Sequence, residues 1–206
     1  MPRVVVVLAL ALPLLAATFV AASDVALTGV QGHPRDRFPL AVHFGPSAER
    51  SYGAAARRSL GHWNAVTRDT LAVQVFYEST TETRADVVVT FHEGTSPTPM
   101  SAAHVDADEA GVIRLPVRIA IYPVAARGET PGDVIVYHLV AHELGHVLGL
   151  GHTRTPRSIM CCIRGTLDWT DPIIRHAYTA GRRRPDVRSA AAQLAEHYAS
   201  FWKRAP

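Results

Sequence analysis

Apolar positions along most of the chain change between the two-residue period of β-strands and the spacing of α-helices. Residues 39–44 (PLAVHF) alternate and predict a strand. Residues 71–77 (LAVQVFY) and 86–91 (DVVVTF) predict two more, because they are rich in β-branched and aromatic side chains. The continuous apolar run in the third segment is typical of a strand covered on both faces. Residues 54–66 carry Ala, Leu and Trp at helical spacing and predict a helix between the first two strands.

A hairpin and two helices are predicted in the second half of the chain. Residues 102–106 and 112–122 form the hairpin, since residues 108–111 (DEAG) between them have turn chemistry. Asp133 follows a Pro-Gly break and is the expected N-cap of a helix that continues to about residue 148. Residues 153–185 are expected to be irregular. A last helix over residues 186–201 places apolar residues on one face, namely Val187, Ala191, Leu194, Tyr198 and Phe201.

The composition is that of one globular domain. The 206 residues are 48% hydrophobic and 19% charged with a formal net charge of +3, which excludes the disordered and low-complexity classes. Lys203 is the single lysine, and residues 182–184 (RRR) form the only run of three basic residues. We interpret this run as a solvated loop, with a polyanion-binding patch as the alternative. A nucleic-acid-binding protein is not expected, because it would carry a larger basic face interleaved with aromatic residues.

The N-terminus has the pattern of a secretory signal. Arg3 precedes an apolar stretch that ends in small residues, and cleavage is expected near Ala22 or Ser23. Pro13 and the modest length of the stretch favour a cleaved signal over an uncleaved membrane anchor, which is the alternative. We therefore predict a secreted or periplasmic protein without stable membrane association after cleavage. Its parts are the signal peptide (1–22), a short N-terminal segment (23–37) and a single domain (38–206).

The sequence HELGHVLGLGH in the second predicted helix indicates a metal site. His142 and His146 are four residues apart, so their imidazoles share one helical face and can bind one ion at about 2.0 to 2.1 Å. Glu143 need not be a ligand; it can take the proton of a metal-activated water and pass it to a leaving amine. Gly149 can end the helix in a left-handed conformation, which brings His152 to the same ion as third ligand.

Other candidate ligands are weaker. His138 precedes His142 by four residues and could compete as a ligand, but we expect it to pack or to form hydrogen bonds near the sheet. His104 and Asp106 are expected at the surface, with a remnant of a structural metal site as the alternative. The remaining histidines have no partner at ligand spacing; they are His33, His43, His62, His92, His176 and His197.

The pattern HExxHxxGxxH resembles the zinc-binding signature of the metzincin metallopeptidases, and Met160 in the following SIM resembles their methionine turn. Within the metzincins the chain is most similar to small secreted microbial-type matrixins. It departs from animal matrixins in lacking a PRCGxPD-like segment, and so their cysteine-switch propeptide. The resemblance covers most of the chain after the signal. It implies an α+β (α/β-like) fold with a twisted, mixed, mostly parallel sheet, an active-site helix, a methionine turn and a C-terminal helix.

The resemblance also implies an activity. The chain would be a monomeric zinc endopeptidase with one catalytic Zn²⁺ on His142, His146 and His152, and Glu143 as general base. Its partner would be an extended peptide or protein substrate along an edge strand. Structural Ca²⁺ or a second Zn²⁺ is not supported, because the loops that hold them in matrixins are mostly absent. Residues proposed to line the substrate site are Ala102, Ala103, His104, Cys161 and Cys162.

The adjacent Cys161 and Cys162 leave three interpretations open. We expect free thiols packed in the wall of the substrate pocket, because a disulfide between neighbours is outside the usual geometry of structural disulfides. A vicinal disulfide is the second interpretation, and a thiolate that contacts zinc or a partner is the third. For the whole protein, the alternative to an endopeptidase is a catalytically silent or latent zinc-binding module that interacts with proteins. Glu143 argues against that module, since a binding protein needs no general base. A metal-dependent hydrolase with a non-peptide substrate is a further alternative.

Overall fold

The computed structural model describes residues 27–47, 49–93, 100–122, 124–163 and 165–204. The signal peptide expected at residues 1–22 lies outside the described residues. None of the described helices is both long enough and apolar enough to cross a bilayer.

A five-stranded sheet forms the centre of the domain, with the strand order β2-β1-β3-β5-β4. All neighbouring strands are parallel except β4, which runs antiparallel to β5 at one edge. This arrangement confirms the predicted mixed, mostly parallel sheet. The hairpin is confirmed as well, since Ala103 pairs with Ile119 and Gly111 takes the left-handed conformation (φ 82°) in the turn. The strands are β1 (Leu40–Phe44), β2 (Phe76–Glu78), β3 (Val87–Phe91), β4 (Ser101–His104) and β5 (Val117–Ile121).

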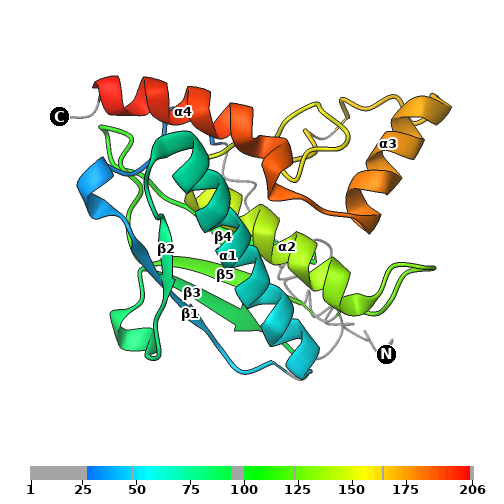
Figure 1. Ribbon diagram of the computed structural model, residues 1–206, viewed down its shortest axis with the longest axis horizontal. Helices are drawn as coiled ribbons and strands as arrows, with labels where there is room; N and C mark the ends of the chain where they lie inside the picture. Colours follow the sequence, from blue (N-terminus) through cyan, green and yellow to red (C-terminus); the bar gives the residue numbers. More distant parts are fainter. Residues whose placement is uncertain (1–26, 48, 94–99, 123, 164, 205–206) are drawn as a thin grey trace, which may run out of the picture.

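Two long helices, α1 (Arg50–Leu71) and α2 (Gly132–Val147), lie side by side over one face of the sheet (Figure 1). The fully buried Trp63 of α1 joins them, because its indole Nε1 donates to the carbonyl oxygen of Ala141 at 2.9 Å. Burial of this large ring and its hydrogen bond fixes α2 against the core, and α2 carries the predicted metal ligands. The described residues also contain three 3₁₀ turns: η1 (Arg35–Arg37), η2 (Glu82–Arg84) and η3 (Val187–Ala190).

Several predicted boundaries are wrong. The helix expected at residues 54–66 extends over Arg50–Leu71, and the hairpin strand expected at 112–122 is shorter, Val117–Ile121. The strand expected at residues 71–77 begins only at Phe76, because α1 continues to Leu71 and ends at Ala72 in the left-handed conformation (φ 54°). The apolar side chains at the start of that segment therefore belong to a helix terminus. Asp133 lies inside the first turn of α2 and is not its N-cap. Its carboxylate instead lies 3.5 Å from the guanidinium of Arg58.

The segment expected to be irregular contains a third helix, α3 (Pro172–Arg183). Asp171 caps it by accepting a hydrogen bond from the backbone N–H of Ile173 at 2.7 Å, and Pro172 stands at a position where its missing N–H costs nothing. The prediction of a loop is therefore wrong for the first two residues of the basic run. Arg182 and Arg183 occupy the last turn of α3, and only Arg184 follows the helix.

The C-terminal helix is confirmed, although its first turn is the 3₁₀ turn η3 and its main part is α4 (Ala191–Arg204). It packs along α1 at the top of the domain in Figure 1. Of the residues predicted on its apolar face, four are buried and Ala191 is partly buried; the four are Val187, Leu194, Tyr198 and Phe201.

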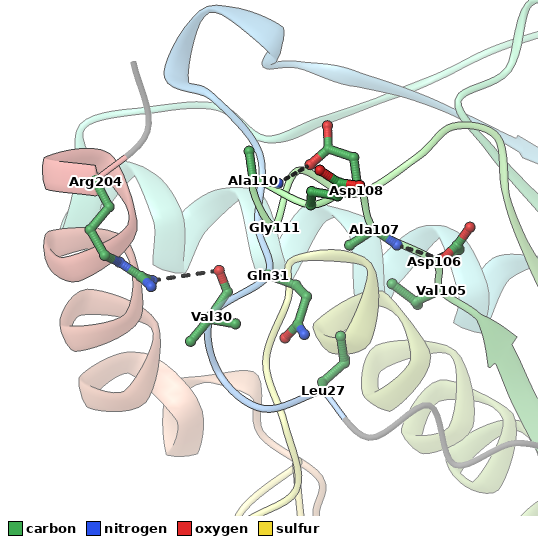
Figure 2. Close-up of a pocket in the computed structure, with 11 residues that line it drawn as sticks. Leu27, Val30, Gln31, Val105, Asp106, Ala107, Asp108, Ala110, Gly111 and Arg204 are labelled. Atoms are coloured by element: carbon green, nitrogen blue, oxygen red, sulfur yellow. Dashed lines mark hydrogen bonds between the residues drawn. The ribbon is translucent and has the colours of Figure 1, made fainter.

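Residues 27–33 are held between the β4–β5 turn and α4. The backbone N–H of Gly32 donates to the carbonyl oxygen of Gly111, and Ile113 donates to Gly32, each at 2.9 Å. Beside this segment is a hollow of about 420 Å³ with Leu27 and Gln31 on one side and the turn on the other (Figure 2). The Asp108 carboxylate on its rim accepts hydrogen bonds from backbone N–H groups of the turn and so stabilises the turn.

Candidate metal centre

Three imidazoles converge between α2 and the segment that follows it. The Nε2 atom of His142 lies 3.1 Å from Nε2 of His146 and 3.1 Å from Nε2 of His152, and the last two are 3.2 Å apart. All three residues are partly buried, and together they are the group of described side chains that could hold an ion. The structure therefore brings together the three residues that the sequence motif selected as ligands.

Local geometry explains this convergence. His142 and His146 are one turn apart on α2 and project from the same face. The helix ends after Val147, and Gly149 reverses the chain with φ at 83°. A Cβ added to Gly149 would collide with the backbone carbonyl of Gln31, so only glycine fits both the conformation and the space. This turn brings His152 back towards the helix.

Backbone carbonyls fix the orientation of two rings. Nδ1 of His142 lies 2.7 Å from the carbonyl oxygen of Ile159, and Nδ1 of His146 lies 2.8 Å from that of Leu150. Because a carbonyl can only accept, each Nδ1 carries the hydrogen and each Nε2 presents a lone pair. Burial lowers the pKa of both histidines to about 4, so the rings are neutral near pH 7.

The donor set fits zinc. Three nitrogens bound tetrahedrally at about 2.0 to 2.1 Å from one ion stand roughly 3.3 Å from each other. The observed separations of 3.1 to 3.2 Å agree with that value. Neutral imidazoles with their second nitrogen bound to a carbonyl are the usual zinc ligands. One ion can thus be held by His142, His146 and His152.

Glu143 is buried beside this set, 4% exposed. Burial raises the pKa of its carboxyl group, while the nearby His146 and a hydrogen bond from Ser101 lower it. The Ser101 hydroxyl at the start of β4 donates to Oε1 of Glu143 at 2.6 Å. A carboxylate in this environment is held in one orientation and has an affinity for protons above that of an exposed glutamate.

Met160 is fully buried under α2. A Cβ added to Gly145 would collide with the sulfur of Met160 and would lie 3.3 Å from the ring of Trp63. Gly145 stands between the two histidines of the helix, so Met160 packs against the backbone that carries them. A polarizable thioether suits such a tight contact, and the assignment of Met160 to a methionine turn stays a prediction.

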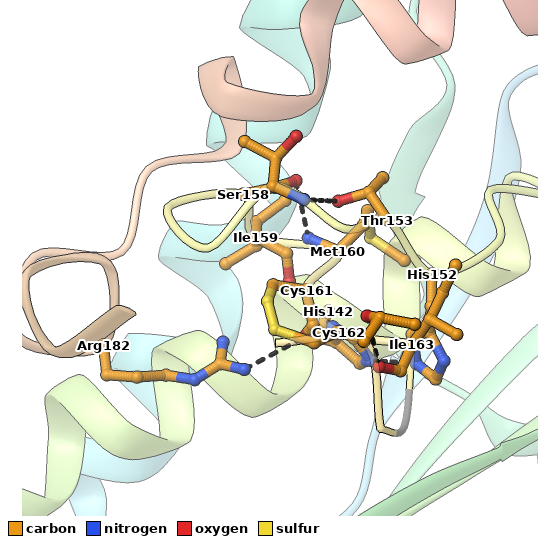
Figure 3. The surroundings of a disulfide bond; sticks show 12 residues. His142, His152, Thr153, Ser158, Ile159, Met160, Cys161, Cys162, Ile163 and Arg182 are labelled. Carbon is orange, nitrogen blue, oxygen red and sulfur yellow. Dashed lines mark hydrogen bonds between the residues drawn. A yellow bond between two sulfur atoms is a disulfide. The ribbon is translucent and has the colours of Figure 1, made fainter. Parts of the chain in front are cut away.

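Cys161 and Cys162 are joined by a disulfide (Figure 3). The expectation of free thiols is therefore wrong, and the second of the three interpretations is the observed one. The bond immediately follows Met160, and Cys161 is buried while Cys162 is partly exposed. The backbone N–H of Ile163 donates to the carbonyl of Thr153 at 3.2 Å, which ties this segment to the residue after His152.

His138 is not among the three converging imidazoles. Its ring contacts the guanidinium of Arg182, which also donates to the carbonyl oxygen of Cys161 at 2.9 Å (Figure 3). Burial lowers the pKa of His138 well below its usual range, and Arg182 adds to this effect. His138 thus joins α2 to α3, as expected for a residue that packs and forms hydrogen bonds.

The predicted substrate-site residues belong to two segments of the chain. Ala102, Ala103 and His104 are on the edge strand β4, which α2 contacts, and His104 is exposed. Cys161 and Cys162 directly follow Met160 in the second segment. Asp106 is also at the surface, where its carboxylate lies 3.5 Å from Arg114. No ligand group involving His104 or Asp106 occurs among the described residues.

Sequence reasoning missed two residues of the site. Ser101 is 42 residues from Glu143 in the chain, and Arg182 is 44 from His138. Neither belongs to a motif. Ser101 directly precedes the strand predicted at residues 102–106, and Arg182 belongs to the basic run that we interpreted as a solvated loop.

Residues 95–169 match the family model of the matrixins. The matched segment includes the edge strand, the helix with the histidines, the glycine turn and the methionine turn. No curated protein matches the chain. The match confirms the resemblance stated on the motif: residues 95–169 are similar to the matrixin-type metzincin catalytic domain, which belongs to the general class of zinc metallopeptidases.

Proposed function

We propose that this matrixin-type domain is a secreted endopeptidase that hydrolyses peptide bonds with one zinc ion. The observation that carries the proposal is the convergence of three Nε2 lone pairs within 3.2 Å of each other beside a buried carboxylate. When bound, the zinc would act as a Lewis acid on the scissile carbonyl and increase the acidity of water in the site.

Glu143 would act as the general base and acid. Its carboxylate would accept the proton of the attacking water, and the same proton can then go to the leaving amine. Ser101 would hold the carboxylate in its orientation through the 2.6 Å hydrogen bond. Glu143 is therefore the catalytic residue of the proposal, and Ser101 is a positioning residue.

The substrate would lie extended along β4. This strand pairs with β5 on one side and is the edge of the sheet on the other. Unpaired backbone groups of an edge strand can bind a peptide as an additional strand. Ala102 and Ala103 have small side chains, which allow a peptide backbone to approach closely.

A second wall of the site, formed by the segment from Cys161 onwards, would determine which substrate side chains are preferred. It begins at the Cys161–Cys162 disulfide and continues towards α3. Trp169 and Ile173 in that region are exposed, with 49% and 75% of their surface accessible. Apolar residues that border the substrate would favour an apolar substrate side chain. We further propose a secreted or periplasmic monomer without a nucleic-acid partner.

The test uses the chain without residues 1–22, loaded with one equivalent of zinc, and a broad peptide library. We expect cleavage that is abolished by a chelator and is lowered about 10²- to 10⁴-fold in Glu143→Gln, since that is the range for loss of a general base. Glu143→Gln should still bind one zinc per chain. Glu109→Gln, which removes an exposed carboxylate in the β4–β5 turn, is the matched control and should cleave normally.

Zinc binding without cleavage in any sample would contradict the endopeptidase. That result, together with no effect of Glu143→Gln on partner binding, would instead support the catalytically silent module. Cleavage of esters or other non-peptide substrates alone would support the third alternative.

A further inference from the structure

A second hollow lies away from the metal centre. It has a volume of about 610 Å³ and lies between the C-terminal half of α3 and the segments on either side of it, residue 157 and residues 186–189. Volumes of this size are typical of sites for small molecules. Its lining is strongly basic, with Arg157, Arg183, Arg184 and His176 against a single carboxylate, Asp186.

The three guanidinium groups come from two separate segments. Arg183 and Arg184 stand at the C-terminus of α3, where positive charge complements the helix dipole. Arg157 belongs to the loop between His152 and Met160, so no helix dipole accounts for its positive charge at the hollow. The backbone of Arg157 rests on Gly181, where an added Cβ would lie 3.1 Å from the Arg157 Cα and carbonyl oxygen. This close contact fixes the loop over α3.

Little negative charge is available to neutralise these arginines. Asp186 caps η3 by accepting the backbone N–H of Arg188 at 2.9 Å, and its single charge balances only one of the three guanidinium groups. Arg183 has a partner in Glu129 at 3.1 Å, outside the lining of the hollow. Within the described part of the chain, neither Arg157 nor Arg184 forms an ion pair.

We propose that this hollow binds a tetrahedral oxyanion, a sulfate or phosphate ester group, carried on a larger polar molecule. Arginine guanidinium groups bind such anions through paired N–H donors, and the negative charge of either ester complements the excess of positive charge. The volume greatly exceeds that of the anion alone, so the remainder would accept the molecule that carries it. The proposal is independent of the peptidase activity.

Binding would be measured by calorimetry with three probes: a sulfated disaccharide, the same disaccharide carrying phosphate, and the uncharged disaccharide. We expect at least one charged probe to bind, the uncharged probe not to bind, and affinity to fall as salt rises. The preferred probe identifies the source of the anion. Binding should be equal in zinc-loaded and chelator-treated protein, because an anion at the metal would be lost with the ion.

Variants locate the site. Arg157→Gln and Arg184→Gln should each weaken binding about tenfold or more, which corresponds to loss of one charge-assisted contact. Arg50→Gln, an exposed arginine at the start of α1, removes the same charge outside the hollow and should leave affinity within about twofold. The proposal is overturned if neither charged probe binds. It is also overturned if Arg157→Gln and Arg184→Gln bind as tightly as the unmodified chain, or if binding requires zinc.

Discussion

Nε2 of His33 lies 2.9 Å from the carbonyl oxygen of Val147, 114 positions along the chain. Val147 is the last residue of α2 and directly follows the second predicted ligand. His33 is fully buried, and its own carbonyl accepts the indole N–H of Trp202 in α4 at 3.0 Å. The N-terminal segment therefore joins the end of the metal-binding helix to the C-terminal helix.

Loss of this contact should destabilise the fold. We expect His33→Ala to lower the free energy of unfolding by about 2 to 4 kcal/mol, because it leaves a buried carbonyl without a donor and opens a cavity. His33→Gln can still donate to Val147 and should lose less. Urea unfolding of the metal-free proteins measures the difference. Equal losses in the two variants would show that the hydrogen bond contributes nothing.

The same histidine predicts a pH dependence of stability. Burial lowers the pKa of His33 from 6.5 to about 4, with Arg37 and His197 adding to the effect and the hydrogen bond to Val147 opposing it. Between pH 4 and 6.5, the imidazole of His33 is protonated in the unfolded chain and neutral in the folded chain. Stability is thus fully present above pH 6.5 and falls as the pH drops towards 4, by about 3 kcal/mol for this group.

Burial also lowers the pKa values of His142 and His146 in the metal-free protein, so these residues add to the pH dependence of its stability. The contribution of His33 is therefore obtained as the difference between the unmodified chain and His33→Gln, unfolded in urea at several pH values from 7.5 to 4. The difference should shrink as the pH falls. A difference that stays constant over this range would contradict the assignment.

The turn at Gly149 predicts a link between backbone conformation and metal affinity. Gly149→Ala adds strain of roughly 1 to 2 kcal/mol at φ 83° and a collision with the carbonyl of Gln31, which displaces His152. We expect zinc affinity to fall at least tenfold, measured by competition with a chelator.

Gly128→Ala is the control for this prediction. Gly128 also has positive φ, 56°, but an added Cβ there would meet nothing within 4 Å. The control carries the conformational strain without the collision and should bind zinc normally. If both variants lost zinc equally, general destabilisation would be the cause.

The fold was predictable where local pattern and burial agree. β1 and β3 are apolar strands in the centre of the sheet, so their patterns have no competing interpretation. Helix α3 was missed although its apolar and polar residues lie on different faces; none of its residues is buried, so it adds nothing to the buried core. Its cap, Asp171 followed by Pro172, was the remaining signal.

The site was predictable only where spacing along one helix determines it. The pair His142 and His146 follows from helical geometry, and Gly149 indicates how His152 can join them. The contact of Ser101 with Glu143 depends on how the edge strand packs on α2, which no local pattern encodes. The prediction of free thiols at Cys161 and Cys162 was wrong. It relied on the usual geometry of structural disulfides, which disfavours neighbouring residues, whereas the structure joins these two.

Ser101 gives the last prediction. Its hydroxyl holds one oxygen of Glu143 at 2.6 Å, so Ser101→Ala should free the carboxylate to rotate while leaving the metal ligands in place. We expect kcat to fall about tenfold with KM little changed, because orientation is lost and substrate contacts are kept. Ser101→Thr retains the hydroxyl and should restore most of the rate. Zinc content measured on the same samples should be one per chain in all three proteins; a loss of zinc in Ser101→Ala would show that Ser101 supports the metal site and not the base.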